Sequence, residues 1–334
     1  MTTLNVLGFD VGGSKISMFL TDSSGKVHKR ARIKTPVFEN PQQLIDLLGD
    51  MADTVEKDTG MIPDSIAVVI AGAVDAVRGI LRSSPNLFGD KEVHLSSMLE
   101  KRLKKVVYIE NDATAVAISE KVFGNGKGFE NFLYITLSTG IGGGIFINNK
   151  VYRGALGMAA EFGHVVMDPQ GPLCGCGRRG CFEAIAGGRG TMKLMEEMGS
   201  YSRSPYLQKI DRQKMEAKDI FAGAEVRDEE CIAVVERVVK NMVSGIANLV
   251  NIFDPEAIMI GGGLANSREL VIDRIEKDLP EALKSMRRNI QIRKTNPITV
   301  ELSPLAVVLN EHETPAFNYE RIVREMREKL SERM

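Results

Sequence analysis

The sequence lacks several features that would point to particular partners or compartments. Its 334 residues carry 43 basic and 44 acidic side chains without a basic block, so nothing predicts nucleic acid or an anionic membrane as a partner. The longest apolar run, around residues 66–74, is strand-sized and is broken by Gly72 and Asp75, too short for a membrane span. Asp10 lies within the first apolar segment, which therefore is not a signal peptide. We expect a cytoplasmic protein of two domains.

Cysteine is also scarce, but three of the four cysteines cluster in the segment HVVMDPQGPLCGCGRRGCFE at 164–183. An odd triplet pairs poorly as disulfides, and we expect no secretory leader that would direct the chain to an oxidising compartment. One imidazole and three thiolates form the ligand set of a closed tetrahedral zinc site, which has no open position and is structural. The fourth cysteine, Cys231, is expected in the core. The candidate zinc ligands are His164, Cys174, Cys176 and Cys181.

Glycine is concentrated in three turns that each follow an apolar strand. They read DVGGSK at 10–15, STGIGGG at 138–144 and GGG at 261–263. Backbone N–H groups in such turns can bind phosphate, although hairpins use glycine without any ligand. None of the turns fits G-x-x-x-x-G-K-[ST] or a helix-opening G-x-G-x-x-G, which disfavours those two nucleotide folds.

The strand–glycine turn–strand unit occurs near residue 10 and again near residue 139, which predicts a duplicated α/β architecture. An amphipathic C-terminal helix is expected to pack back on the body. Strands are predicted at 4–9, 16–20, 27–34, 67–71, 106–109, 132–137, 145–147 and 257–260, and helices at 41–59, 113–122, 229–252 and 318–333.

The order of these motifs resembles the ROK family of sugar kinases, part of the hexokinase–actin–Hsp70 superfamily. The resemblance rests on D-x-G-G-[ST]-K, T-G-I-G-G-G, E-x-G-H and C-x-C-G-x-x-G-C-x-E, and covers residues 8 to about 263. It implies an α/β, two-domain actin-like (ribonuclease H-like) ATPase fold with duplicated mixed sheets flanked by helices. We expect a small domain at 1–112, with the C-terminal helix at about 318–334 on it, and a larger domain at 113–317 carrying the zinc loop. The stretch LSPLAVVLNEHETPAF departs from the small-residue pattern that is usual there.

The resemblance also implies a nucleotide site. Asp10 would face Mg²⁺ and the triphosphate, whereas on its own it reads as a turn-capping carboxylate. The expected cofactors are ATP, Mg²⁺ and structural Zn²⁺. The residues expected to bind the nucleotide and its magnesium are Asp10, Gly12, Gly13, Ser14, Lys15, Thr139, Gly140, Gly262 and Gly263.

The pair Asn111-Asp112 resembles the family's catalytic dyad. Asp112 would accept a proton from the attacking sugar hydroxyl; without the motif the pair reads as a helix N-cap, and the two roles are compatible. Without the resemblance, Glu161 would be interpreted as a surface carboxylate and Glu183 as a residue at the start of a helix. The expected sugar-binding residues are Gly72, Asn86, Asn111, Asp112, Glu161, His164 and Glu183.

The favoured function is that of an ATP-dependent hexokinase, a glucokinase that phosphorylates the 6-hydroxyl of glucose. Residues 123–132 and the cysteine segment also resemble the N-acetylmannosamine kinase branch, so that sugar or another N-acetylhexosamine is the alternative. Ala73 favours glucose, because some N-acetylhexosamine kinases have arginine there. A sugar-responsive repressor would carry a winged helix ahead of residue 10, for which there is no room, and the sugar-pocket residues argue against a filament former. We expect a homo-oligomer, a dimer or a tetramer.

Overall fold

The computed structural model describes residues 4–284 and 288–311. The chain forms two compact units. The first consists of residues 1–128, 151–159 and 296–334, and the second of residues 129–150 and 160–295. The helix expected at 318–334 lies outside the described residues.

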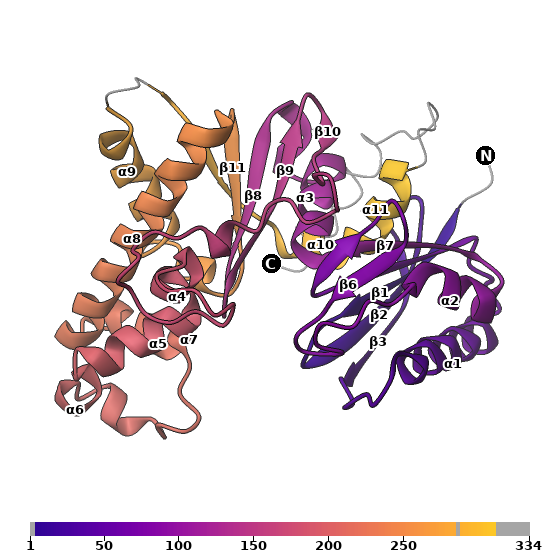
Figure 1. Ribbon diagram of the computed structural model, residues 1–334, viewed down its shortest axis with the longest axis horizontal. Helices are drawn as coiled ribbons and strands as arrows, with labels where there is room; N and C mark the ends of the chain where they lie inside the picture. The colour runs from indigo at the N-terminus through magenta and orange to yellow at the C-terminus, as the bar shows by residue number, and fades with distance from the viewer. Residues whose placement is uncertain (1–3, 285–287, 312–334) are drawn as a thin grey trace. The chain divides into compact units, whose positions relative to one another are not determined.

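The first unit is built on a five-stranded mixed sheet in the order β3-β2-β1-β4-β7 (Figure 1). Strands β1, β2 and β3 form an antiparallel meander, and β4 and β7 run parallel to β1. Its strands are β1 (Asn5–Val11), β2 (Lys15–Asp22), β3 (Val27–Lys34), β4 (Ser65–Ile70) and β7 (Val106–Asn111), with a separate hairpin of β5 (Ala73–Asp75) and β6 (Ile80–Ser83).

Helices cover both faces of this sheet. Neighbouring residues of a strand point to opposite faces, so adjacent residues of β1 pack against different helices. Phe9 belongs to the core that packs against α1 (Pro41–Thr59) and α2 (Leu95–Leu103). The adjacent Gly8 faces Pro304 of α11 (Ser303–Glu311), where a larger side chain would collide. Helix α11 packs in turn on α3 (Asp112–Val122).

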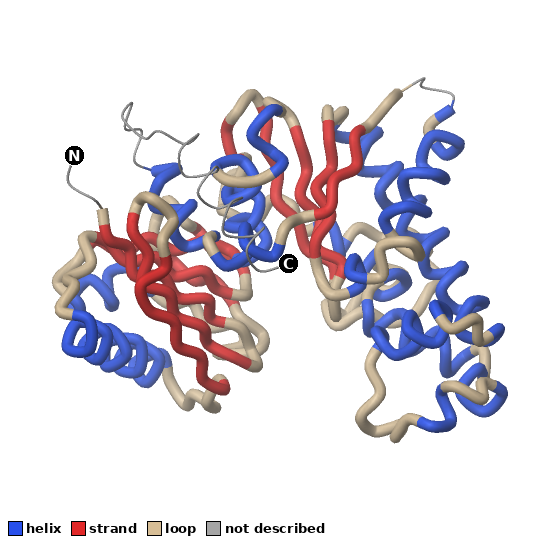
Figure 2. The backbone as a smooth tube through the Cα atoms, turned by 180° about the vertical axis from the view of Figure 1, so that it is seen from behind, coloured by secondary structure: helices blue, strands red, loops and turns tan. Residues whose placement is uncertain are grey.

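The second unit repeats this arrangement with a sheet in the order β10-β9-β8-β11-β12, again with helices against it (Figure 2). Strands β8 and β9 form an antiparallel hairpin, and β11 runs parallel to β8. Its strands are β8 (Phe132–Leu137), β9 (Ile141–Ile147), β10 (Lys150–Val151), β11 (Ala257–Gly261) and β12 (Gln291–Lys294). Its helices are α4 (Phe182–Ala186), α5 (Gly188–Glu197), α6 (Ser200–Arg203), α7 (Ala217–Glu225), α8 (Glu229–Phe253) and α9 (Ile272–Ala282).

The long helix α8 shows how local sequence sets these elements. Asp228 caps its N-terminus by accepting the backbone N–H of Cys231, and Glu229 and Glu230 lie in the first turn, where carboxylates interact favourably with the helix dipole. Its apolar residues recur on one buried face. Cys231 is fully buried, as expected.

The first unit extends beyond residue 112, where the sequence placed the domain boundary. Helix α3 is buried along most of its length, and residues 296–311 return to pack on it. The buried carboxylate of Glu120 accepts hydrogen bonds from the N–H of Asn125 and from the hydroxyl of Thr299, which fastens this return. Within the described residues, no helix is long and apolar enough to cross a membrane.

Candidate functional site

The carboxyl ends of β1, β4 and β7 lie at one edge of the first sheet, because the three strands are parallel. Val11 pairs with Ile70, and Ile70 with Asn111. Asp10, Gly72 and the Asn111-Asp112 pair are therefore brought to the same edge. Ligands of open α/β sheets bind outside the carboxyl ends of the strands, so this edge is the candidate site of the first unit.

Asn111 organises this edge through three hydrogen bonds. Its Oδ1 accepts the N–H of Thr114 (3.0 Å), so the residue is the N-cap of α3. Its Nδ2 donates to the carbonyl of Gly72 (2.9 Å) and to Oδ1 of Asp112 (3.1 Å). Asp112, the first residue of α3, is exposed, and its Oδ1 also accepts the N–H of Ala113. The capping role is confirmed, and it leaves the Asp112 carboxylate at the surface.

Asp10 lies half-buried beside the first glycine turn. Burial raises the pKa of Asp10, while the charges of Lys15 and Arg32 oppose the rise. The N–H of Gly12 donates to the carbonyl of Lys15 (3.0 Å) and closes the turn, in which Ser14 is exposed. A half-buried carboxylate with a raised pKa fits a divalent cation, which would offset the cost of its desolvation.

Two further predicted residues pack at this edge. A Cβ on Gly13 would lie 2.7 Å from Cβ of Asn86, so the turn rests against Asn86. Gly72 has φ +146°, and a Cβ there would collide with the carbonyl oxygen of Ser83. Only glycine fits this position, and its carbonyl is thereby free to point at Asn111.

The second unit brings its two glycine turns together in the same way. Gly261 pairs with Thr136, so the turns that follow β8 and β11 share an edge. Gly262 has φ +91°, and a Cβ there would strike the carbonyl of Leu137. Gly263 lies beside Ser138. The predicted residues Thr139, Gly140, Gly262 and Gly263 thus form one edge.

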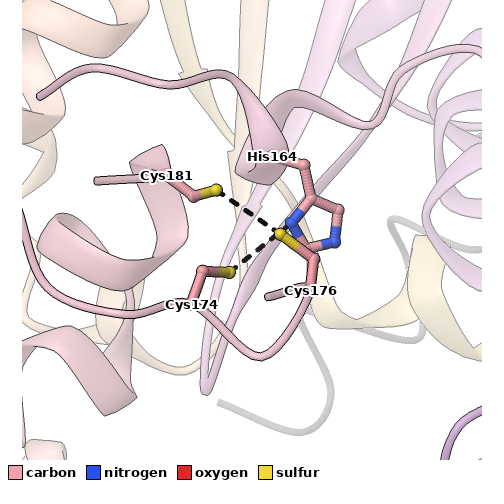
Figure 3. A group of neighbouring side chains, drawn as sticks. All are labelled: His164, Cys174, Cys176 and Cys181. Carbon is pink, nitrogen blue, oxygen red and sulfur yellow. Dashed lines mark hydrogen bonds between the residues drawn. The ribbon is translucent and has the colours of Figure 1, made fainter. Parts of the chain in front are cut away.

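The four candidate zinc ligands converge, as Figure 3 shows. Their ligand atoms lie within 4.8 Å of one another. Sγ of Cys174 is 3.7 Å from Nδ1 of His164, and Sγ of Cys176 is 3.6 Å from Sγ of Cys181. Two sulfurs bound to one tetrahedral zinc at ~2.3 Å lie roughly 3.8 Å apart. The donor set and its spacing therefore fit zinc.

The thiols of this cluster differ in acidity. The backbone N–H of Arg178 lowers the pKa of Cys176 to about 6, whereas burial raises the pKa of Cys174 to about 12. Zinc binds thiolates, so its binding would remove the proton of Cys174.

Two carboxylates flank the cluster. Oε1 of Glu183 accepts a hydrogen bond from Sγ of Cys174 (3.2 Å), and a Cβ on Gly140 would lie 2.5 Å from its Oε2. Oε2 of Glu161 is 3.9 Å from Nε2 of His164. Burial raises the pKa of Glu161; His164 lowers it and Glu183 raises it. Glu183 therefore lies between the cluster and the glycine turn of β8, and Glu161 lies beside the cluster at His164.

Comparison with known proteins identifies the family. The sequence model of the ROK family matches residues 6–299. The chain belongs to the ROK family. It is 35% identical to the glucokinase of Thermotoga maritima, over 81% of this chain and 86% of that one, and 34% identical to the N-acetylmannosamine kinase of Haemophilus influenzae, over 83% and 87%. The crystal structure of a ROK glucokinase from Streptomyces griseus, in complex with glucose and AMPPNP, superposes with a TM-score of 0.75 at 31% identity, over 92% and 97%. The expected family and the actin-like fold are confirmed.

Two cations on α5 of this ROK chain were not predicted from the sequence. Arg189 and Lys193 line a cavity of about 90 Å³ together with Thr139 and Glu183. Their spacing of four residues places both on one face of the helix, and the segment GGRGTMK carries that signal. Glu110 and Arg153 were not predicted either, and their pairing joins residues 43 positions apart.

Proposed function

We propose that this ROK sugar kinase transfers the γ-phosphate of ATP to the 6-hydroxyl of glucose. The observation that carries the proposal is the Asn111-Asp112 pair at the carboxyl edge of the first sheet, the edge that also holds Asp10. The relatives named glucokinase and the glucokinase crystallised with glucose and AMPPNP support it.

In this proposal Asp112 accepts the proton of the sugar hydroxyl while the hydroxyl oxygen attacks the γ-phosphorus and ADP leaves. A hydroxyl is a poor nucleophile, and a positioned base accelerates such a step by ~10²–10⁴-fold. Asn111 holds Asp112 through the 3.1 Å hydrogen bond between their side chains. Bound Mg²⁺ would neutralise charge on the transferred phosphoryl group, and Asp10 is the residue that would hold it.

The remaining predicted residues divide between sugar and nucleotide. Sugar hydroxyls would be bound by Asn86, Asn111, Glu161, His164 and Glu183 and by the backbone at Gly72. Gly12, Gly13, Ser14, Lys15, Thr139, Gly140, Gly262 and Gly263 would approach the nucleotide. Arg189 and Lys193 add positive charge beside Thr139, which suits a triphosphate.

The zinc is proposed as a structural ion that holds the 164–183 loop. With the loop fixed, Glu161 and Glu183 are oriented before the sugar arrives, which lowers the entropic cost of binding it. The ligands would be His164, Cys174, Cys176 and Cys181, whose geometry fits the ion.

N-acetylmannosamine, or another N-acetylhexosamine, is the second candidate substrate. The relative with that activity is nearly as similar as the glucokinase, 34% against 35%. Ala73, the first residue of β5 and the neighbour of Gly72, favours glucose because some N-acetylhexosamine kinases have arginine there.

A panel of sugars with Mg²⁺ and ATP tests the choice. We expect the highest kcat/KM with glucose, and ADP and glucose 6-phosphate as products. A kcat/KM that is higher with N-acetylmannosamine would replace glucose by that sugar, and no transfer to any hexose would remove the proposal. The expected dimer or tetramer is tested by light scattering on the same preparation.

A further inference from the structure

Strand β7, which leads into the Asn111-Asp112 pair, has a buried carboxylate next to its last residue. Glu110 of β7 is 2% exposed. Its Oε1 accepts the backbone N–H of Asn111 (3.0 Å), and its Oε2 accepts Nε–H of Arg153 (2.7 Å). Burial raises the pKa of Glu110, and the Arg153 guanidinium opposes the rise. A carboxylate this deeply buried requires such a partner, because an unpaired buried charge is strongly destabilising.

Arg153 joins three segments of the first unit. Its side chain is 17% exposed, and its Nη2 donates to Oε1 of Glu311 at the end of α11 (2.8 Å). It lies in the segment 151–159, which is also held at Gly157, where a Cβ would collide with the carbonyl of Val74. Arg153 therefore fixes this segment to the carboxyl end of β7.

We propose that Glu110 and Arg153 are positioning residues for Asp112. The ion pair fixes the Glu110 carboxylate, and that carboxylate holds the N–H of Asn111 at the point where β7 turns into α3. The orientation of this peptide sets where the next residue, Asp112, projects. The inference rests on the proposed role of Asp112 as base, and it assigns no contact with substrate to either Glu110 or Arg153.

Loss of the pair is expected to lower kcat more than it raises KM. Arg153→Met should reduce kcat by ~10- to 100-fold, the cost of a reacting group displaced by about 1 Å. The KM values for sugar and ATP should stay close to those of the parent, because the interaction lost matters in the transition state. Arg153→Lys keeps a cation but not the fork that reaches both carboxylates, so it should recover part of kcat.

Arg102→Met is the matched control. Arg102 also donates to two carboxylates, those of Asp50 and Asp53, but it does so between α1 and α2. We expect its kcat to equal that of the parent. A loss of kcat equal to that of Arg153→Met would show a general effect of removing a guanidinium and would overturn the proposal.

A double variant separates positioning from stability. Arg153→Met leaves Glu110 buried without its cation and should lower Tm, whereas Glu110→Gln/Arg153→Met removes both charges and should restore much of Tm. A kcat that stays low in this stabilised variant supports positioning. A kcat that returns with Tm, or an Arg153→Met enzyme that turns over like the parent, overturns it.

Asp112→Asn, assayed in parallel, distinguishes a failure of the proposed function from a failure of the positioning pair. Full turnover by Asp112→Asn would remove the proposed base and this inference with it. An inactive Asp112→Asn beside a fully active Arg153→Met would leave the proposed function standing and remove only the positioning pair.

Discussion

Asn111 uses every polar atom of its side chain to fix its neighbours. One atom caps α3, and the other joins the carbonyl of Gly72 to the carboxylate of Asp112. A side chain held at three points loses little further freedom when a ligand arrives. The geometry of the dyad is therefore set before the sugar binds.

The first prediction concerns Asp112. Asp112→Asn should fold and bind sugar and ATP normally, because asparagine has nearly the same size and keeps the Oδ1 that accepts from Asn111 and Ala113. Its kcat should fall by about 10²-fold or more, since the amide cannot accept the proton. Steady-state kinetics with a thermal melt on the same sample measure both; near-normal turnover would exclude Asp112 as the base.

The second prediction concerns Gly72. Gly72→Ala should lower the free energy of unfolding by about 1–3 kcal/mol, because its φ of +146° and the nearby Ser83 carbonyl leave no room for a Cβ. Gly128→Ala is the control: nothing lies within 4 Å of the added methyl, so its effect should stay within ~0.5 kcal/mol. Urea unfolding measures the difference, and equal values for the two variants would contradict the steric argument.

Among the elements, the strands were the part most predictable from sequence. Short apolar runs beside glycine turns located β1, β2, β8 and β11, because a buried strand and its turn are encoded locally. The prediction for β9 was wrong in its first half, since residues 141–144, expected in the turn, already belong to the strand. The His164 and cysteine spacing likewise located the metal-type cluster. The pair of Glu110 and Arg153 could not be found this way, because it depends on a return of the chain that no local pattern encodes.

The third prediction concerns the loop at 164–183. Cys176→Ser should lower the zinc content of the protein, raise the sugar KM strongly and leave the ATP KM nearly unchanged, since the loop ends at Glu183 and its first residue, His164, lies beside Glu161. Cys231→Ser should change neither the zinc content nor the sugar KM. Cys176 is exposed and Cys231 is fully buried, so a packing effect alone would act in the opposite order.

Elemental analysis measures the zinc content of the parent and the two variants, and steady-state kinetics measures their KM values for sugar and ATP. One zinc ion per chain is expected in the parent. A parent protein that is metal-free and fully active would contradict the structural role of the ion.

At the scale of the whole molecule, the chain passes from one unit to the other four times, after residues 128, 150, 159 and 295. Glu120 bonds to one residue shortly before the first passage, Asn125, and to one shortly after the last, Thr299. It is fully buried, with Oε2 on the N–H of Asn125 (2.7 Å) and Oε1 on the hydroxyl of Thr299 (2.8 Å). One carboxylate therefore fastens both segments within the first unit.

The fourth prediction is that Glu120→Gln lowers the free energy of unfolding by about 1–3 kcal/mol, because the amide nitrogen cannot accept and one buried donor loses its partner. Glu39→Gln is the control; its exposed side chain has no hydrogen-bond partner among the residues described, and its effect should stay within ~0.5 kcal/mol. Thr299→Val removes the hydroxyl that Glu120 accepts, so its cost and that of Glu120→Gln should not add in the double variant. Urea unfolding of the parent and the four variants tests this. Fully additive costs would show that Glu120 and Thr299 act independently and that the carboxylate does not fasten the returning segment.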